Sequence, residues 1–344
     1  MREELVIYQK KCDVWYYYRY LCTKFIAMRV IDLLNTHSQT AFSFELLPPL
    51  KGNSFKKVCQ VIDKLREFDP KYINITTHHS ENIYREAENG WMKKVNIRKR
   101  PGTVAIAAAI QYHYGITAVP HLICKGFTQE ETEYALIDLN FLGVHDLLVL
   151  RGDTNKLDRD QMQPGHSHEH ALDLQQQVND FNRGIALDGS PFEPFETPFS
   201  YGVACYPEKH EEAPNMESDI AFLKKKIEAG ADYMVTQMFF DNAKYFAFVD
   251  RCRAEGITVP IIPGIKPVVF KDQLTALPKI FRAEIPEIFA NELRKCKTDD
   301  EAKIVGIEWG IQQCKELMAH GVPSIHFYTL LATDSVRRIA REIY

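Results

Sequence analysis

The sequence predicts an α/β protein folded as a (β/α)8 TIM barrel with an N-terminal extension. Three observations support this class: eight strand-like apolar runs, helical patterns between successive runs, and no GxGxxG motif after the first run. Repeated strand–helix units indicate a parallel sheet, and eight of them indicate closure into a barrel. A doubly wound open sheet is the alternative, which the missing GxGxxG motif disfavours.

The strand candidates are short and several are almost wholly apolar, as strands buried on both faces should be. They span residues 41–47, 71–76, 117–124, 145–151, 200–206, 232–239, 259–265 and 324–330. Helical patterns span 54–67, 130–142, 217–229, 242–255 and 301–320. Ser54 and Thr128 stand where helix caps are expected, and Gly230, Gly256 and Gly321 follow helix ends. Segments 154–170 and 182–198 are predicted loops.

Composition limits the functional class. The 344 residues include 45% hydrophobic and 26% charged residues, which is ordinary for a globular protein of one barrel. The net charge is −4 and no basic stripe is visible, so we expect no nucleic-acid partner. No apolar run is long enough to cross a bilayer, so we expect no membrane partner. Eight cysteines without a CxxC pair are typical of a reducing compartment, and we expect a cytoplasmic location.

The first 27 residues differ from the rest. They are rich in tyrosine and lack the apolar core of a signal peptide. One hypothesis is that Met28 is the native initiator and residues 1–27 are an upstream extension. The alternative is an extra helix packed outside the barrel. We therefore assign the barrel to residues 28–344 and leave the role of residues 1–27 open, to be decided by the N-terminal mass of natively expressed protein.

Polar residues stand at the C-terminal ends of the predicted strands, where barrel enzymes hold their active sites. Glu45 lies in an apolar strand, where burial would raise its pKa and suit a general acid; a structural glutamate is the alternative. Arg151 beside Gly152 would suit phosphate or carbonyl binding, although Arg151 and Asp153 could equally form an internal ion pair. Gln237 lies among aromatic residues and requires a ligand or a backbone partner.

The histidine-rich segment GHSHEH (residues 165–170) raises the question of a zinc or nickel site. No further ligands converge from nearby sequence, so a solvated loop is the preferred interpretation and we predict no metal site. The strand ends instead combine a buried acid, donors for an anion and several aromatic faces. This combination suits a bulky planar cofactor that carries the difficult chemistry.

Six motifs, in order, resemble those of methylenetetrahydrofolate reductases. They are FSFELLPP (42–49), LRGD (150–153), ACYPEKH (204–210), AGAD with TQMFFD (229–241), PGI (263–265) and HFYTL (326–330). The resemblance is to the catalytic barrel of the bacterial type, without the C-terminal regulatory domain of eukaryotic relatives. It implies an FAD-containing barrel that reduces 5,10-methylenetetrahydrofolate to 5-methyltetrahydrofolate, a step that feeds methionine synthesis. NADH or NADPH would reduce the flavin and leave before the folate binds, and the sequence does not distinguish the two nucleotides.

The same resemblance implies roles for individual residues. Glu45 would be the general acid, Asp153 would tune the flavin and hold the folate, and Gln237 would contact folate and nicotinamide in turn. Gln273 would contact the folate. The flavin-contacting positions would be Thr76, His121, Leu150, Arg151, Gly152, Asp153, His170, Ala171, Tyr206, His210, Asp219, Lys225 and Lys226. The adjacent lysines would supply charge for the FAD diphosphate and ribose region.

One departure concerns the folate tail. Many family members follow HFYTL with Asn-Arg, whereas Leu331 and Ala332 stand here, and Arg337 or Arg338 could replace the missing arginine. We expect a homo-oligomer, since the family often forms them. The competing hypotheses are another FAD barrel oxidoreductase resembling proline dehydrogenase, a non-catalytic folate-binding relative, and a metal-dependent hydrolase that uses the histidine-rich loop.

Overall fold

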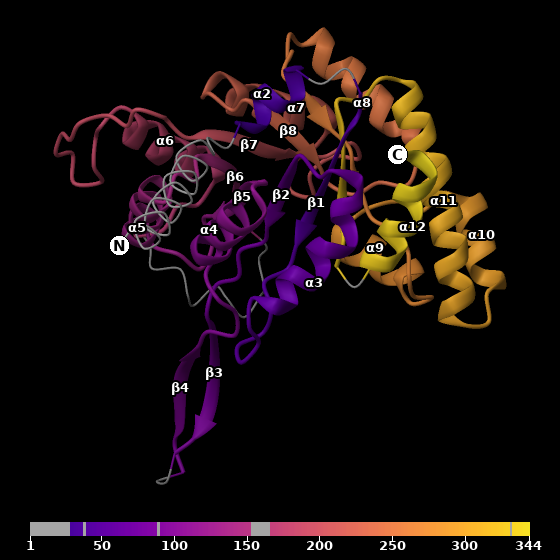
Figure 1. The fold of residues 1–344 in the computed structure, drawn as a ribbon, viewed down its shortest axis with the longest axis horizontal. Helices are drawn as coiled ribbons and strands as arrows, with labels where there is room; N and C mark the ends of the chain where they lie inside the picture. The colour runs from indigo at the N-terminus through magenta and orange to yellow at the C-terminus, as the bar shows by residue number, and fades with distance from the viewer. Residues whose placement is uncertain (1–27, 37–38, 88–89, 153–165, 331) are drawn as a thin grey trace, which may run out of the picture.

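A computed structural model describes residues 28–36, 39–87, 90–152, 166–330 and 332–344 (Figure 1). The barrel strands are β1 (Ala41–Leu46), β2 (Tyr72–Ile75), β5 (Thr117–Ile123), β6 (Asp146–Leu150), β7 (Ser200–Cys205), β8 (Tyr233–Thr236), β9 (Ile261–Ile262), β10 (Gly264–Ile265) and β11 (Ser324–Tyr328). The helices are α2 (Val30–Thr36), α3 (Lys56–Leu65), the 3-10 turn Arg66–Phe68, α4 (Thr103–Tyr114), α5 (Gln129–Phe141), α6 (Ala171–Asn182), α7 (Met216–Glu228), α8 (Asn242–Ala254), α9 (Gln273–Phe281), α10 (Glu287–Lys295), α11 (Asp299–Ala319) and α12 (Thr333–Ile343). The N-terminal extension, Asp153 and most of the predicted loop 154–170 lie outside the described residues.

The parallel strands follow the order β10-β11-β1-β2-β5-β6-β7-β8-β9. The two end strands, β9 and β10, are halves of one extended segment separated by Pro263, which has no N–H for the ladder. The first half pairs with β8 and the second half pairs with β11, so this segment closes the ring. The predicted barrel is therefore confirmed, with each of the eight expected strands in place.

Apolar side chains close the N-terminal end of the barrel. Val30 and Leu34 of α2 pack with Tyr72, Tyr233 and other interior residues of the strands. The backbone N–H of Val30 donates to Asp146 Oδ1 at 2.8 Å, which attaches α2 to the start of β6. A larger apolar cluster fills the layer between the strands and the surrounding helices. The polar opening of the barrel is thus at the opposite, C-terminal end of the strands.

We expect the substitution Asp146→Asn to stabilise the protein at alkaline pH. Burial raises the pKa of Asp146 to about 7, above its value in the unfolded chain. The neutral carboxyl therefore favours the fold at low pH, and this contribution is lost as the pH rises toward 7 and beyond. Asparagine keeps an acceptor for Val30 and cannot ionise. Its gain in unfolding free energy over the wild type, measured with urea, should be larger at pH 8 than at pH 5 by roughly 2 kcal/mol. Equal gains at both pH values would contradict this expectation.

The helix caps test the sequence predictions one by one. Thr128 caps α5 and forms a capping box with Glu131, as expected. The predicted serine cap at Ser54 is wrong: α3 begins at Lys56 after Phe55, and no side chain caps it. The Ser54 carbonyl already accepts a hydrogen bond from Lys57 N at 3.1 Å, so the chain enters this helix through a turn. Segment 182–198 is a loop as predicted, with one isolated bridge between Ile185 and Pro191.

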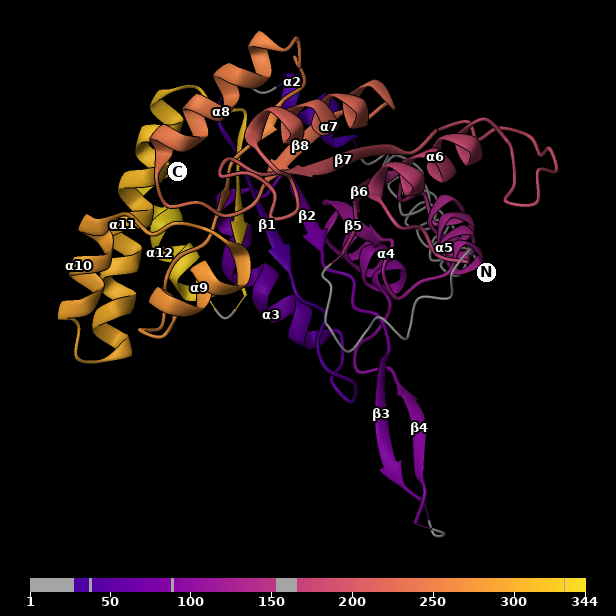
Figure 2. The ribbon, with the colours of Figure 1, turned by 180° about the vertical axis from the view of Figure 1, so that it is seen from behind.

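Several elements were not predicted. They include α4, α6, α9, α10 and α12, and an antiparallel hairpin formed by β3 (Glu81–Glu86) and β4 (Met92–Ile97). Figures 1 and 2 show that this hairpin projects from the barrel on the side toward which β1 and β2 run. Its sequence signal is an Asn-Gly pair at residues 89–90 between two extended segments. Among the described helices, none has the length and apolar character required to span a bilayer.

Candidate active site

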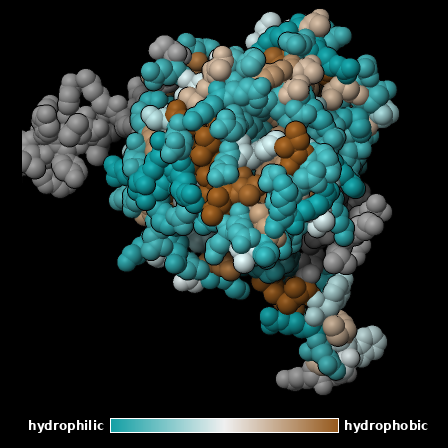
Figure 3. Space-filling model, turned by 90° about the vertical axis from the view of Figure 1, so that its right-hand side faces the viewer, coloured by the Kyte–Doolittle hydropathy of each residue, from teal (hydrophilic) through white to brown (hydrophobic). Residues whose placement is uncertain are grey.

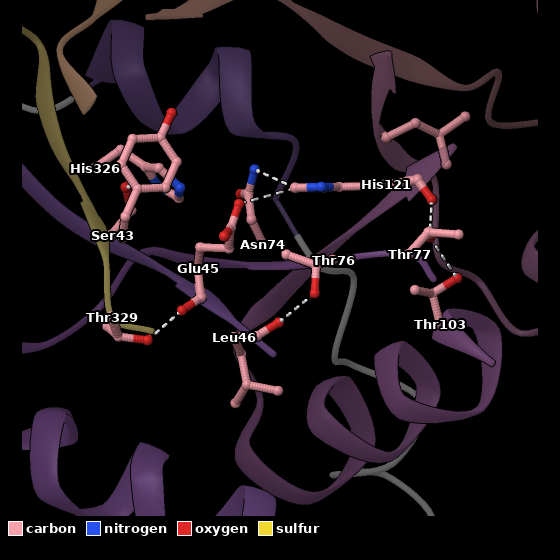
Figure 4. Close-up of polar contacts among 12 residues, drawn as sticks. Ser43, Glu45, Leu46, Asn74, Thr76, Thr77, Thr103, His121, His326 and Thr329 are labelled. Carbon is pink, nitrogen blue, oxygen red and sulfur yellow. Dashed lines mark hydrogen bonds and ion pairs between the residues drawn. The ribbon is translucent and has the colours of Figure 1, made fainter. Parts of the chain in front are cut away.

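Glu45 lies inside the barrel near the C-terminal ends of the strands. Its side chain is only 13% exposed. Parallel pairing places Glu45 beside Asn74 on β2 and Tyr328 on β11. The hydroxyl of Thr329 donates to the backbone carbonyl of Glu45 (Figure 4). Because both neighbouring strands hold this position, the carboxyl group has a defined place at the barrel mouth.

A neutral histidine faces the Glu45 carboxyl. His121 Nε2 is 3.9 Å from Glu45 Oε2 and 3.3 Å from Asn74 Nδ2 (Figure 4). Burial, together with smaller effects of the nearby His326 and His78, lowers the pKa of His121 to about 3. The contact with Glu45 is therefore not an ion pair near neutral pH, although its length alone would permit one. Asn74 Oδ1 is buried and has no hydrogen-bond partner among the described residues, which leaves an acceptor for a ligand N–H.

The polar groups on the interior of β1, β2 and β11 are also neutral. Ser43 Oγ lies 3.0 Å from His326 Nδ1, and Tyr72 OH donates to Ser324 Oγ at 3.2 Å. Burial raises the pKa of Tyr72 to about 12 and lowers the pKa of His326 to about 3. These groups supply hydrogen bonds but do not exchange protons near pH 7. Glu45, on the same face of β1 as Ser43, is the carboxylic acid beside these groups.

Lys266 is a buried cation at this end of the barrel. It follows β10, is 7% exposed, and donates from Nζ to the carbonyl oxygens of Leu330 at 2.6 Å and Tyr328 at 3.4 Å. Burial lowers its pKa to about 8, and the charge of Glu45 opposes that shift. Lys266 is not among the site residues predicted from the sequence. The available signal was a lysine placed directly after an apolar barrel strand and followed by proline.

A second charged group lies where β6 and β7 end. Arg151 Nη2 donates to Glu212 Oε1 at 2.9 Å. Burial lowers the pKa of Lys226. The charge of Asp219 opposes this shift, and the charge of Arg151 reinforces it. Burial also lowers the pKa of His210, and Arg151 again reinforces the effect. Three basic side chains thus lie close enough to affect one another, which is an arrangement that an anionic ligand would stabilise.

Residues 29–343 match the family model described as methylenetetrahydrofolate reductase. The chain belongs to the methylenetetrahydrofolate reductase family. This match covers all the barrel strands and both groups of polar residues described above.

Individual relatives agree with the family assignment. The chain is 31% identical over 299 residues to the 5,10-methylenetetrahydrofolate reductase of Buchnera aphidicola, covering 87% of this chain and 89% of that protein. It is 30% identical over 317 residues to the probable methylenetetrahydrofolate reductase (NADPH) of Caenorhabditis elegans. That alignment covers 91% of this chain and 43% of the relative. It is 30% identical over 316 residues to methylenetetrahydrofolate reductase (NADH) 1 of Arabidopsis thaliana. That alignment covers 88% of this chain and 48% of the relative. The chain therefore spans about half the length of these two eukaryotic relatives.

One solved structure supports the fold. It is an uncharacterized protein from Clostridium thermocellum that binds two copies of 5-methyl-5,6,7,8-tetrahydrofolic acid. The TM-score is 0.55 at 15% identity, and the alignment covers 91% of this chain and 97% of that one. At this identity the likeness concerns the barrel alone.

Most of the positions that the reductase family suggests for the flavin lie at the strand ends. Thr76 follows β2, and its N–H donates to Leu46 O at 3.1 Å. Leu150 ends β6, and Gly152 follows it with a φ of +85°, where a Cβ would lie 3.2 Å from Ile123. Tyr206 follows β7, and its ring packs edge-on against His210 at 4.7 Å. His170 is the N-cap residue of α6, and Ala171 begins that helix.

The structure separates the two adjacent lysines predicted for the diphosphate region. Lys225 is exposed and lies over the ring of Phe222 at 5.1 Å. Lys226 instead turns inward and donates to Ala204 O at 3.5 Å, near the end of β7. They lie on neighbouring positions of α7, about 100° apart around the helix, and therefore face different surroundings. In this geometry only Lys226 joins Arg151 and His210.

Both predicted folate-contacting glutamines have backbone partners. Gln237 Oε1 accepts from Met238 N at 2.9 Å, which meets the requirement for a ligand or a backbone partner. Gln237 and Tyr206 also line a hollow of about 10 Å³. This hollow has room for one water molecule at most. Gln273 Oε1 accepts from Val269 N at 2.7 Å at the start of α9. Their amide N–H groups are the parts suited to meet a ligand oxygen.

The histidine-rich segment contributes hydrogen bonds within the protein where it is described. His168 Nε2 lies 2.6 Å from Gln177 Oε1, and His166 lies 4.0 Å from Glu130. Across the described ranges, the fold brings together no three His, Cys, Asp or Glu side chains suited to a metal ion. The six cysteines in these ranges are free thiols.

Proposed function

We propose that this chain is a flavin-dependent methylenetetrahydrofolate reductase that uses NADH or NADPH. The observation that carries the proposal is Glu45, an acid held at the barrel mouth beside neutral His121. Membership of the reductase family supports the reaction class. The names of the relatives support both nucleotides, since NADH-dependent and NADPH-dependent forms occur among them.

The residues present fit FAD. Arg151 and Lys226 provide positive charge for a diphosphate, and His210, whose pKa is lowered by burial, is a neutral group suited to hydrogen bonding. Buried Asn74 Oδ1 provides an acceptor that a ring N–H would satisfy. Bound FAD would accept a hydride from the nucleotide and pass it to the folate. Asp153, which lies outside the described residues, remains a sequence-based proposal for tuning the flavin and holding the folate.

The protein's own chemical contribution is a proton. Glu45 gives its proton to N10 of 5,10-methylenetetrahydrofolate, the methylene–N10 bond breaks, and an iminium forms at N5 ready to take the hydride. His121 and Asn74 orient the carboxyl group, and Gln237 and Gln273 direct amide N–H groups toward the folate. The folate binds after the oxidised nucleotide leaves, on the same face of the barrel.

A visible spectrum of the purified protein tests this proposal. Flavin bands should bleach on anaerobic addition of NADH or NADPH and return on addition of methylenetetrahydrofolate. Bleaching without return would indicate another FAD oxidoreductase, and absence of bleaching by nucleotide would favour a proline dehydrogenase-like enzyme. Folded protein that takes up no FAD would favour the non-catalytic relative. A stoichiometric metal in untagged protein would favour the hydrolase.

We further propose that the chain forms a homo-oligomer through the β3–β4 hairpin. Figure 3 shows the hairpin projecting beyond the body of the barrel. Tyr84, Trp91 and Met92 are exposed on it, with Trp91 at 76%. A two-stranded ribbon with exposed aromatic residues is marginally stable in water alone, so contact with another surface would stabilise it. Lys93 and Lys94 add positive charge beside these apolar groups.

A second copy of this chain offers a complementary surface. A hollow of about 380 Å³ lies between α10 and α11, lined by Phe289, Val305 and Trp309. Glu292 and Glu308 are the charged residues that line it. An apolar hollow bordered by carboxylates matches a ribbon that exposes both apolar side chains and the two lysines of β4. Figure 3 views this side of the molecule and shows hydrophobic side chains gathered in a depression.

Charge reversal on either surface should therefore dissociate the oligomer. We expect Lys93→Glu/Lys94→Glu and Glu292→Lys/Glu308→Lys each to yield monomers by light scattering coupled to size exclusion. The combined fourfold variant should restore association, because the charges again match. A monomeric wild type, or an oligomer that survives either double change, would refute this interface.

An adjacent lysine pair elsewhere provides the control. Lys56 and Lys57 are exposed on α3. Reversal of both charges there should leave the oligomer intact.

A further inference from the structure

Lys266, at the barrel mouth, has no part in the chemistry outlined above. A lysine in so buried a position is costly unless its charge is used, because removal of an ammonium group from water is unfavourable. Two backbone carbonyl oxygens, those of Tyr328 and Leu330, offset part of this cost. They fix the ammonium at the C-terminal end of β11.

The register of the strands places this ammonium at the level of Glu45. Glu45 pairs with Tyr328 across β1 and β11, and Ile265 pairs with Phe327 across β10 and β11. Lys266, one residue after Ile265, therefore stands on the same level as Tyr328 and Glu45. The hydroxyl of Thr329 ties the Glu45 backbone to the same turn of chain. Lys266 and Glu45 thus flank Tyr328 and are attached to one short segment, residues 328–330.

We propose that Lys266 is a positioning residue for Glu45: its buried ammonium stabilises the carboxylate that Glu45 becomes after it gives its proton to the substrate. The proton moves from the Glu45 oxygen to the substrate nitrogen, and Lys266 keeps its own proton throughout. The inference rests on the acid role of Glu45 in the proposed function. Lys266 would make proton release from the buried Glu45 carboxyl more favourable, because a nearby positive charge stabilises the carboxylate that remains.

Three other titratable groups facing this site, Tyr328, His326 and His121, do not change charge near neutral pH. Burial raises the pKa of Tyr328 on β11, and it lowers the pKa values of His326 on β11 and His121 on β5 to about 3. Lys266 itself has a pKa lowered to about 8 by burial. Among these four groups, Lys266 is the one that loses charge as the pH rises from 7 to 9.

Direct titration of Glu45 tests the inference without relying on turnover. The protein is labelled with 13C at the glutamate carboxyl carbon, and the Glu45 resonance is identified by its loss in Glu45→Gln. Lys266→Met should move the Glu45 midpoint upward by about one pH unit, whereas Lys266→Arg should leave it close to the wild-type value. The wild-type resonance should also show a second inflection near pH 8, as Lys266 titrates, which requires no substitution. A midpoint unchanged in Lys266→Met, with no second inflection in the wild type, would overturn the inference.

The pH dependence of flavin reoxidation by folate gives the second readout. The wild-type rate should fall above about pH 8 as Lys266 loses its proton. Lys266→Met should be slower by about tenfold at pH 7 and should lack this fall, whereas Lys266→Arg should keep the rate and move the fall to higher pH. Reduction by the nucleotide should be unchanged in both variants, and a matching loss there would overturn the inference. If the wild-type flavin is not reoxidised by folate at all, the proposed function fails, and the titration still decides whether Lys266 acts on Glu45.

Discussion

Glu45→Gln should abolish folate reduction while FAD binding and reduction by the nucleotide persist. The amide has nearly the same size as the carboxyl group but cannot give up a proton. A positioned general acid typically contributes 10²–10⁴-fold, so we expect flavin reoxidation by methylenetetrahydrofolate to slow on the order of 10³-fold. Anaerobic stopped-flow measurement of the two half-reactions separates the effects, because only the second half-reaction requires the proton.

The control for this change is Glu228→Gln, an exposed glutamate at the end of α7. It makes the same carboxyl-to-amide change without touching the barrel mouth, and both half-reactions should proceed as in the wild type. If Glu45→Gln reoxidised with folate at a rate near that of the wild type, Glu45 would not be the acid. The structural interpretation of this residue, a carboxyl that merely joins neighbouring strands, would then be preferred.

Gly264→Ala should be the most destabilising single methyl addition near the site. A Cβ at residue 264 would lie 2.4 Å from Thr236 O and 2.6 Å from Tyr328 Cε2. Neither can move easily, because Tyr328 OH donates to Thr236 O at 2.6 Å. Overpacking of this kind typically costs 1–3 kcal/mol, and we expect about 3 kcal/mol from the urea unfolding midpoint. Since Tyr328 lies beside Glu45, the folate half-reaction should slow as well.

Gly102→Ala is the matched control for this prediction. The Cβ there would meet only the end of the flexible Arg98 side chain, at 2.6 Å, and that chain can turn away. We expect its unfolding midpoint to stay close to that of the wild type. If Gly264→Ala unfolded at the same midpoint as Gly102→Ala, the tight packing between β8, β10 and β11 would not limit stability.

The sequence predicted the architecture well because the relevant signals are local. Strands buried on both faces appear as short apolar runs, and each of the eight runs became a barrel strand. The same apolar pattern predicted that Glu45 lies at a strand end. It failed at Ser54, since a residue type alone does not reveal that the chain is already turning before the helix begins. It also missed the β3–β4 hairpin, which breaks the strand–helix alternation.

The sequence by itself determined the barrel class, the eight strands and the place of Glu45 at a strand end, through hydrophobic patterning and motif order. Only the tertiary structure decided which distant groups surround Glu45: neutral His121 from β5 lies 3.9 Å from its carboxylate, and Lys266 from beyond β10 is close enough to feel its charge. It also decided that Lys226 turns inward while Lys225 does not. The physical reason is that the charge state of a side chain depends on its burial, and the direction in which it points depends on strand register and packing. Both arise only when segments hundreds of residues apart close into one ring.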